Sequence, residues 1–194
     1  MKIGIFGGCF NPPHKMHKEI SKYLINNKYL DKIIYVPTES NYNKKDLIKF
    51  IDRYNMLELM VKDLDNVEIS DIANNGYYYT YQVLDYFKNK YEKDQIYFIC
   101  GSDNLRDFEH WKCFNYILTN YNLLVIKRNK DNIKELLNKY NNYNIKVANI
   151  KKSNISSTII RNKIKDQKSV VGYLDNDIIK YINENNLYRE NDVC

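Results

Sequence analysis

Short apolar runs alternate with longer stretches of helical periodicity along nearly the whole chain, and this alternation restricts the fold more than any other feature. The runs that predict strands lie at residues 2–6, 32–36, 67–69, 95–100, 123–127 and 145–150, and those at 2–6, 32–36 and 95–100 are expected to be buried. Apolar residues at helical spacing predict helices at about residues 17–27, 46–64, 80–89, 111–118, 131–140, 156–166 and 175–185. Strands that alternate with helices are typical of the α/β class. We therefore expect a doubly wound parallel sheet with helices on both faces.

The chain is expected to form one domain. A length of 194 residues suits a single ordinary domain and would be cramped for two. We assign residues 1–190 to that domain and expect residues 191–194 to form a disordered tail. No apolar run approaches the roughly 18 residues that a membrane span needs, and the N-terminal run makes a poor signal peptide. These features predict a cytoplasmic protein with no membrane partner.

The composition is biased toward Lys, Asn, Ile and Tyr, with 19 Tyr and a formal net charge of +6. A coding bias toward A/T-rich codons explains this most simply, because it raises all four residues together. A basic, aromatic surface that binds nucleic acid is the functional alternative. Most Tyr fall in expected helices, strands or the C-terminal part without a basic stripe beside them, so we expect no nucleic-acid partner.

The cysteines do not form a metal-binding or redox pattern. Cys9, Cys100, Cys113 and Cys194 include no C-x-x-C pair and no spacing suited to zinc. In a cytosolic setting we expect them to be reduced thiols.

Glycines and histidines follow the first expected strand, in the segment GGCFNPPHKMH at residues 7–17. Ligands of doubly wound sheets bind beyond the carboxyl ends of the strands. Gly7 and Gly8 let the backbone approach a ligand closely, and the N-terminus of the following helix suits a phosphate. His14 and His17 lie three residues apart, so both can face one site and donate hydrogen bonds to phosphate oxygens. Two surface histidines in a turn are the plain alternative, and zinc is disfavoured because no third ligand lies nearby.

A second group of polar residues follows the last expected strand, in the segment ISSTIIR at residues 155–161. Ser156, Ser157 and Thr158 open a helix whose first N–H groups are unpaired. Arg161 can lie on the same turns and clamp a phosphate. An ordinary Ser N-cap explains the same pattern without a ligand.

Together these segments resemble the two motifs of the nucleotidylyltransferase superfamily with the H-x-G-H signature, G-G-x-F-x-P-x-H-x-G-H and I-S-S-T-x-I-R. The chain is most similar to one branch, the bacterial nicotinate-nucleotide adenylyltransferases. It shares with that branch a Tyr-Thr pair and a G-x-D…W element, here Tyr79-Thr80, Gly101, Asp103 and Trp111. The similarity continues to residue 188 and so covers nearly the whole chain.

The resemblance implies a Rossmann-like fold and a reaction of NAD biosynthesis. ATP and nicotinate mononucleotide would give nicotinate adenine dinucleotide and pyrophosphate, with Mg²⁺ accompanying ATP and no metal ligand assigned to the chain. By the same resemblance His14 and His17 are the catalytic residues. The ATP-binding residues would be Gly7, Gly8, Cys9, Phe10, Gly101, Asp103, Ser156, Ser157, Thr158 and Arg161. The residues that bind the pyridine mononucleotide would be Lys44, Thr80 and Trp111, with Trp111 stacked on the pyridine ring.

The chain departs from the family pattern at several positions. Met16 replaces the Gly of the signature, so its side chain either points away from the ligand or narrows the pocket. The acidic and hydroxyl residues that follow the Tyr-Thr pair are Gln82 and Val83 here. Arg53 lies on an expected helix and is left outside the site.

Two other functions stay open. One is another adenylyl- or cytidylyltransferase of the superfamily, such as the phosphopantetheine enzyme, against which the G-x-D…W element argues. The other is a non-catalytic nucleotide- or RNA-binding protein, against which the retained histidine pair argues. The choice between the acid and the amide mononucleotide depends on a single carboxylate contact. A homo-oligomer is also left open.

Overall fold

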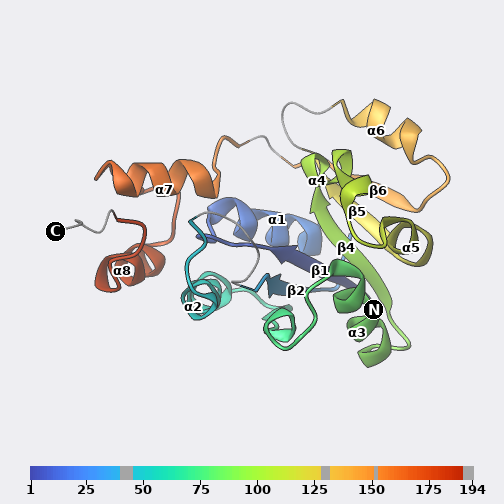
Figure 1. Ribbon diagram of the computed structural model, residues 1–194, viewed down its shortest axis with the longest axis horizontal. Coiled ribbons are helices and arrows are strands. Elements are labelled where there is room, and N and C mark those ends of the chain that lie inside the picture. The colour runs from blue at the N-terminus through green and yellow to red at the C-terminus, as the bar shows by residue number, and fades with distance from the viewer. Residues whose placement is uncertain (40–45, 128–131, 151–152, 190–194) are drawn as a thin grey trace.

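Six parallel strands form the centre of the protein, and helices cover both faces of the sheet (Figure 1). The computed structural model describes residues 1–39, 46–127, 132–150 and 153–189. The strands are β1 (Lys2–Gly8), β2 (Lys32–Pro37), β3 (Val67–Ile69), β4 (Gln95–Gly101), β5 (Asn122–Ile126) and β6 (Ile145–Ala148). Their order in the sheet is β3-β2-β1-β4-β5-β6, and each pairing is parallel. The predicted doubly wound α/β fold is confirmed.

Helices follow the strands as expected, with differences at their ends. Those in the described part of the chain are α1 (Lys15–Asn26), α2 (Phe50–Val61), α3 (Thr80–Lys90), α4 (Ser102–Arg106), α5 (Phe114–Asn120), α6 (Ile133–Lys139), α7 (Ser157–Lys165) and α8 (Asn176–Glu184). Two 3-10 turns, η1 (Ile72–Asn74) and η2 (Phe108–His110), join them. The short α4 and both 3-10 turns were not predicted.

Two predicted helix starts are wrong for the same physical reason. Asp46 has a φ of 71° and Cys113 a φ of 57°, so each backbone is left-handed rather than helical. The first helix therefore begins later, at Phe50, with Lys49 at its N-cap. The second begins at Phe114 instead of Trp111, with Cys113 at its N-cap.

The four central strands, β1, β2, β4 and β5, bury both of their faces, because successive side chains point to opposite sides of the sheet. On β1, Ile3 and Ile5 belong to one hydrophobic cluster, whereas Phe6 belongs to the other. The cluster on the Phe6 side receives buried side chains from α1, α2, α7 and α8. The opposite cluster receives them from α3, α4 and α5. Two continuous cores thus fix the positions of the strand ends, where the site lies.

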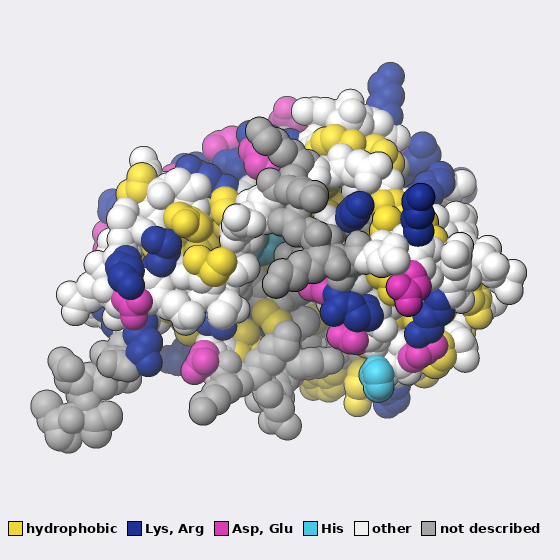
Figure 2. Space-filling view, turned by 90° about the horizontal axis from the view of Figure 1, so that it is seen from above, with side chains coloured by type: hydrophobic (Ala, Val, Ile, Leu, Met, Phe, Trp, Pro, Cys, Tyr) yellow, Lys and Arg dark blue, Asp and Glu magenta, His cyan; other side chains and the backbone are white. Residues whose placement is uncertain are grey.

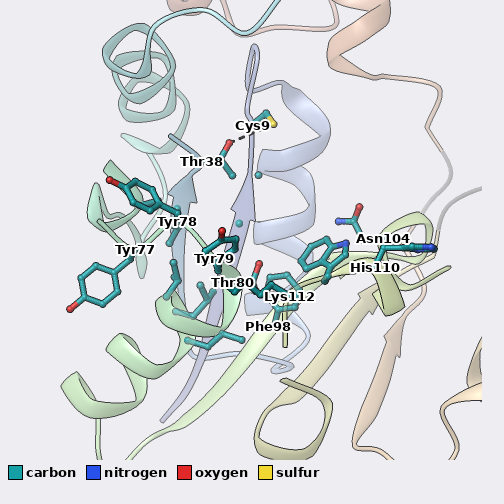
Figure 3. A pocket seen from close by; sticks show the side chains of 18 residues that line it. Cys9, Thr38, Tyr77, Tyr78, Tyr79, Thr80, Phe98, Asn104, His110 and Lys112 are labelled. Atoms are coloured by element: carbon teal, nitrogen blue, oxygen red, sulfur yellow. Dashed lines mark hydrogen bonds between the residues drawn. The ribbon is translucent and has the colours of Figure 1, made fainter. Parts of the chain in front are cut away.

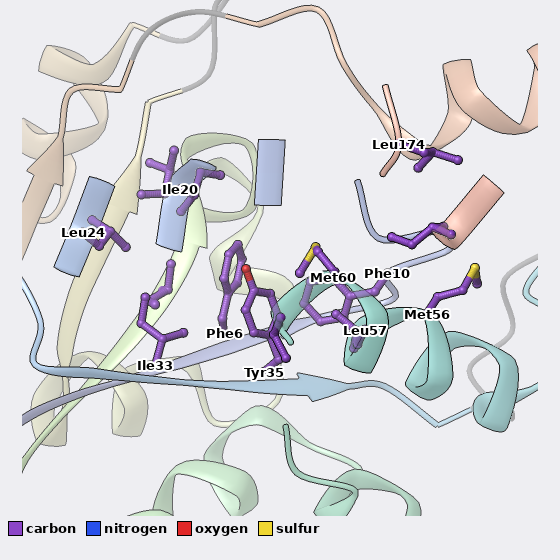
Figure 4. Packing of buried hydrophobic residues seen from close by; sticks show 14 of the residues in the cluster. Phe6, Phe10, Ile20, Leu24, Ile33, Tyr35, Met56, Leu57, Met60 and Leu174 are labelled. Carbon is purple, nitrogen blue, oxygen red and sulfur yellow. The ribbon is translucent and has the colours of Figure 1, made fainter. Parts of the chain in front are cut away.

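The cluster on the α1 side also supports the segment that follows β1 (Figure 4). Phe6 stacks on Tyr35 of β2, with ring centroids 5.1 Å apart. Phe10 meets the edge of both rings, at 5.7 Å from Phe6 and 5.2 Å from Tyr35. The glycine-led turn is therefore anchored to the core by its own aromatic residue.

Candidate active site

A cavity of about 480 Å³ opens at the carboxyl ends of β1 and β2 (Figure 3). It lies between the N-terminus of α3 and the residues that follow η2. The chain runs outward from β1 to β3 on one side and from β4 to β6 on the other, so the strand order reverses beside β1. This is where doubly wound sheets bind ligands. Sequence-predicted site residues that line the cavity are Gly7, Gly8, Cys9, Thr80 and Trp111.

One wall of the cavity is aromatic. Trp111 is half-buried, and its ring centroid lies 5.8 Å from Phe98 and 5.0 Å from Phe108. Both of those rings are buried in the sheet core. Trp111 is therefore part of the core on one side and part of the cavity wall on the other.

The two glycines of the turn differ in the space around them. A Cβ on Gly8 would lie 3.0 Å from the ring of Phe10, closer than ordinary van der Waals contact. A Cβ on Gly7 would meet nothing nearer than the Phe98 ring at 3.8 Å. Phe10 itself has a φ of 46°. A Cβ on Gly8 would thus press on the Phe10 ring, whereas a Cβ on Gly7 would make ordinary van der Waals contact with Phe98.

His14 and His17 lie together at the N-terminus of α1. Their rings are stacked, with centroids 3.8 Å apart and planes 18° apart. The backbone N–H of His14 donates to Nδ1 of His17 at 3.2 Å. Neutral His17 therefore carries its proton on Nε2, where it can be donated. The Tyr35 hydroxyl donates to the His17 carbonyl oxygen at 2.9 Å and fixes this first turn to β2.

The second motif contacts the backbone of the first. The Ser157 hydroxyl donates to the Pro12 carbonyl oxygen at 2.9 Å, and Arg161 donates to the Asn11 carbonyl oxygen at 2.9 Å. The oxygen of Ser156 accepts from the backbone N–H of Ile159 at 3.3 Å, which makes Ser156 the N-cap of α7. Thr158 is exposed on the first turn of α7. The two segments that the sequence places 150 residues apart therefore form one structure.

Arg53 holds the same loop from α2, although it was left outside the predicted site. Its side chain is fully buried, and it donates to the carbonyl oxygens of Cys9 at 2.9 Å and Ile48 at 3.1 Å. Burial lowers the pKa of the guanidinium. Helical spacing places Arg53 on α2 but gives no sign of a partner 44 residues away, so the sequence offered no signal for this role.

Tyr188 is a second residue whose role the sequence did not reveal. Its hydroxyl donates to Oδ1 of Asn11 at 2.9 Å. Nδ2 of the same Asn11 donates to the Asp46 carbonyl oxygen at 2.7 Å. Burial raises the pKa of the Tyr188 phenol.

The remaining predicted residues within the described ranges are not among those that line the cavity: Phe10, His14, His17, Gly101, Asp103, Ser156, Ser157, Thr158 and Arg161. Gly101 ends β4 and is the N-cap of α4, and Asp103 is exposed in the first turn of α4. Phe10 is buried under the glycine turn. Lys44 lies outside the described residues.

Met16 does not extend the cavity. It is half-buried and packs against the hydrophobic cluster on the α1 side of the sheet. Of the two orientations considered for this replacement of glycine, the structure has the one directed into the core.

The described residues contain no group of three or more His, Cys, Asp or Glu placed to hold a metal ion. Within the same ranges, no helix has the length and apolarity needed to cross a bilayer.

Comparison with known proteins decides the family. The family model described as cytidylyltransferase-like matches residues 5–163. A "Probable nicotinate-nucleotide adenylyltransferase" of Clostridium botulinum (strain Alaska E43 / Type E3) is 37% identical, over 97% of this chain and 98% of that protein. The chain belongs to the nicotinate-nucleotide adenylyltransferase family. A second relative of the same printed name, from Endomicrobium trichonymphae, is 36% identical over 97% of this chain and 99% of its own.

Solved structures of an adenylyltransferase from another organism have the same fold as this protein. The nicotinic acid mononucleotide adenylyltransferase of Plasmodium falciparum complexed with NaAD superposes with a TM-score of 0.85, at 23% identity, over 96% of this chain and 97% of that one. The same protein complexed with APC superposes with a TM-score of 0.82, at 22% identity, over 96% of both chains. The predicted family, fold and enzyme class are confirmed by these matches together.

Proposed function

We propose that this protein joins ATP and nicotinate mononucleotide to form nicotinate adenine dinucleotide and pyrophosphate, a reaction of NAD biosynthesis. One observation carries the proposal. The glycine turn that leads into the histidine pair and the aromatic wall at Trp111 line the same cavity at the switch point of the sheet. A reaction that joins two nucleotides end to end needs a phosphate-binding turn and a ring-binding wall within one site.

The aromatic wall suits the pyridine ring of the mononucleotide. A flat ring stacked on Trp111 gains aromatic contact and excludes water from one face. Thr80 lies at the N-terminus of α3 on the same cavity and would contact the ring substituent. Lys44, outside the described residues, remains a candidate for the mononucleotide phosphate.

The turn and the helix N-termini suit the phosphates of ATP. His14 and His17 would donate to the α-phosphate, and the backbone of Gly7, Gly8, Cys9 and Phe10 would approach the nucleotide. Ser156, Ser157, Thr158 and Arg161 would hold the β- and γ-phosphates. Arg161 uses one nitrogen on the Asn11 carbonyl and retains further N–H donors for a ligand. Gly101 and Asp103 would contact the adenosine, with Asp103 at the ribose hydroxyls.

The chemistry is a single in-line displacement. A phosphate oxygen of the mononucleotide attacks the α-phosphorus of ATP, and the bond to the bridging oxygen breaks with its electron pair leaving on pyrophosphate. The chain positions the reactants and stabilises charge on the α-phosphoryl group, and no covalent intermediate with the protein forms. ATP enters as its Mg²⁺ complex, so the ion is counted with the substrate.

An acceptor assay tests this proposal. The protein is incubated with ATP, Mg²⁺ and one acceptor at a time: nicotinate mononucleotide, nicotinamide mononucleotide or phosphopantetheine. We expect pyrophosphate release to be fastest with nicotinate mononucleotide. Release only with phosphopantetheine would show another transferase of the superfamily, and ATP binding without release on any acceptor would show a non-catalytic protein.

The remaining expectations about the whole protein are also proposals. We propose a single domain over residues 1–190 and a place in the cytoplasm, supported by the reduced thiols of Cys100 and Cys113. Cys194 and the predicted disordered tail at 191–194 lie outside the described residues. On the face shown in Figure 2, basic and acidic side chains are interspersed, which does not favour a nucleic-acid partner. A homo-oligomer remains open to direct measurement.

A further inference from the structure

The described walls of the cavity carry one fixed charge. Among the described residues that line it, Lys112 is the only Lys or Arg, and none is Asp or Glu. The remaining lining residues are glycines or carry apolar, aromatic, thiol, hydroxyl or amide side chains, apart from the exposed His110. A single cation beside largely apolar walls favours an anionic ligand group over a neutral one of the same shape.

The position of this cation is defined by an aromatic ring. Nζ of Lys112 lies 4.0 Å from the centroid of the Tyr79 ring, which is within the range of a cation–π contact. Tyr79 is the N-cap of α3 and directly precedes Thr80, while Lys112 directly follows Trp111. Figure 3 accordingly shows Tyr79, Thr80 and Lys112 close together. Cys9, which follows the two glycines, and Thr38, which follows β2, lie apart from them.

We propose that Lys112 makes this site prefer the acid mononucleotide to the amide mononucleotide. The inference rests on the proposed function, because it assumes that the pyridine ring stacks on Trp111. Nicotinate and nicotinamide rings have nearly the same shape and differ in one substituent, a carboxylate or a neutral amide. An ammonium group offers three donors and no acceptor, so it forms charge-assisted hydrogen bonds only with the carboxylate.

Tyr79 acts here as a positioning residue. An exposed lysine samples many rotamers, and ordering it on binding costs conformational entropy. The contact with the Tyr79 ring restricts Lys112 before the ligand arrives. Loss of the ring is therefore expected to weaken the preference for the acid without removing the charge.

The test measures kcat/KM for pyrophosphate release with each mononucleotide and takes the acid-to-amide ratio. We expect Lys112→Met to lower this ratio about tenfold, mainly through a higher KM for the acid. Lys112→Arg keeps the charge and should restore most of the ratio. Tyr79→Phe keeps the ring and should change little, whereas Tyr79→Leu should give an intermediate ratio.

Lys90→Met is the matched control. Lys90 also lies over aromatic rings, 5.7 Å from the Tyr91 centroid and 5.9 Å from the Tyr86 centroid, but it does not line this cavity. Its replacement removes the same charge and should leave the ratio unchanged. Mononucleotide affinities from the fluorescence of Trp111, the single tryptophan of the chain, give the ratio independently of turnover.

The possible results of these assays test the role of Lys112 and the proposed function separately. If Lys112→Met weakens both mononucleotides equally, Lys112 binds their shared phosphate and the inference is wrong. If the variant leaves the ratio at the wild-type value, the preference comes from elsewhere and the inference is also wrong. If the wild-type protein releases pyrophosphate with neither mononucleotide, the proposed function itself fails.

Discussion

Asn11 is the residue on which the distant parts of the site converge. Its carbonyl oxygen accepts from Arg161, 150 residues away, and its side-chain oxygen accepts from Tyr188, 177 residues away. Asn is common in turns, so nothing in the local sequence indicates that Asn11 connects distant segments. The motifs predicted which segments carry the chemistry, because glycines, histidines and hydroxyls have local signatures. The side chains that hold those segments have no such signature.

His17 allows a direct test of the proposed chemistry at the scale of one side chain. We expect His17→Ala to lower kcat for pyrophosphate release by about 100- to 1,000-fold, because it removes a donor aimed at the transferring phosphoryl group. Steady-state kinetics with saturating ATP and mononucleotide provides the measurement. Circular dichroism should show a folded protein. Turnover near the wild-type rate in a folded variant would exclude His17 from the chemistry.

Two glycines of β1 should respond differently to the same added methyl group. A Cβ on Gly4 would lie 2.4 Å from Leu30 and 2.7 Å from Ile99 in the core, whereas Gly7 has nothing nearer than 3.8 Å. We expect Gly4→Ala to reduce the free energy of unfolding by about 1–3 kcal/mol through overpacking. Urea unfolding compares the two variants. Gly7→Ala should stay close to wild type, and equal losses in both would contradict the packing argument.

At the scale of elements, the strands were easier to predict than the helix ends. Strand prediction relied on apolar runs, and all six runs form strands of the sheet. The four central strands are buried on both faces, whereas the edge strands β3 and β6 are only partly buried. Helix starts depend on single backbone conformations. Left-handed Asp46 and Cys113 moved two starts by several residues, and the five-residue α4 is too short to show a helical period.

The segment after α8 should influence the loop between β1 and α1 through one hydrogen bond. Tyr188→Phe removes the donor to Asn11 Oδ1 and keeps the ring, and we expect it to cost about 1–3 kcal/mol of stability. We also expect a higher KM for ATP, because the backbone of the loop that would bind ATP loses the hydrogen bond from Tyr188. The value of kcat should change little, because the side chains proposed to act in the reaction are not altered. Thermal unfolding and ATP titrations test the two effects. A stable variant with unchanged KM would show that the contact is dispensable.

At the scale of the whole molecule, the tyrosines are largely structural. Tyr35, Tyr97, Tyr121 and Tyr140 belong to the buried core, and Tyr188 supports the active-site loop. The composition therefore reflects aromatic residues used for packing in a domain with two hydrophobic clusters.

Buried tyrosines predict a loss of stability at alkaline pH. Burial raises the pKa of Tyr35 and of Tyr188 above the ordinary value of about 10. Below that value both folded and unfolded states keep the proton, so the contribution of these phenols is fully present. Above it the unfolded chain loses protons that the folded protein retains, and the free energy of unfolding falls as pH rises. Urea midpoints from about pH 9 to about pH 11 should decrease steadily.

Tyr35→Phe provides the comparison for this pH dependence. It removes one buried phenol, so the decline of the urea midpoint with pH should become shallower, although the variant also loses the hydrogen bond to His17. A midpoint in the wild-type protein that is flat or rising over this range would contradict the expected sign.

The contact between Tyr188 and Asn11 also bears on how the protein is made. During translation the glycine turn and the histidine pair leave the ribosome well before Arg161 and Tyr188, which follow Asn11 by 150 and 177 residues. A nascent chain can pair β1 with β2 early, but the loop between β1 and α1 lacks these two supports until synthesis has passed residue 188. Partly synthesised chains therefore carry the histidine pair without the two hydrogen bonds that hold the loop before it.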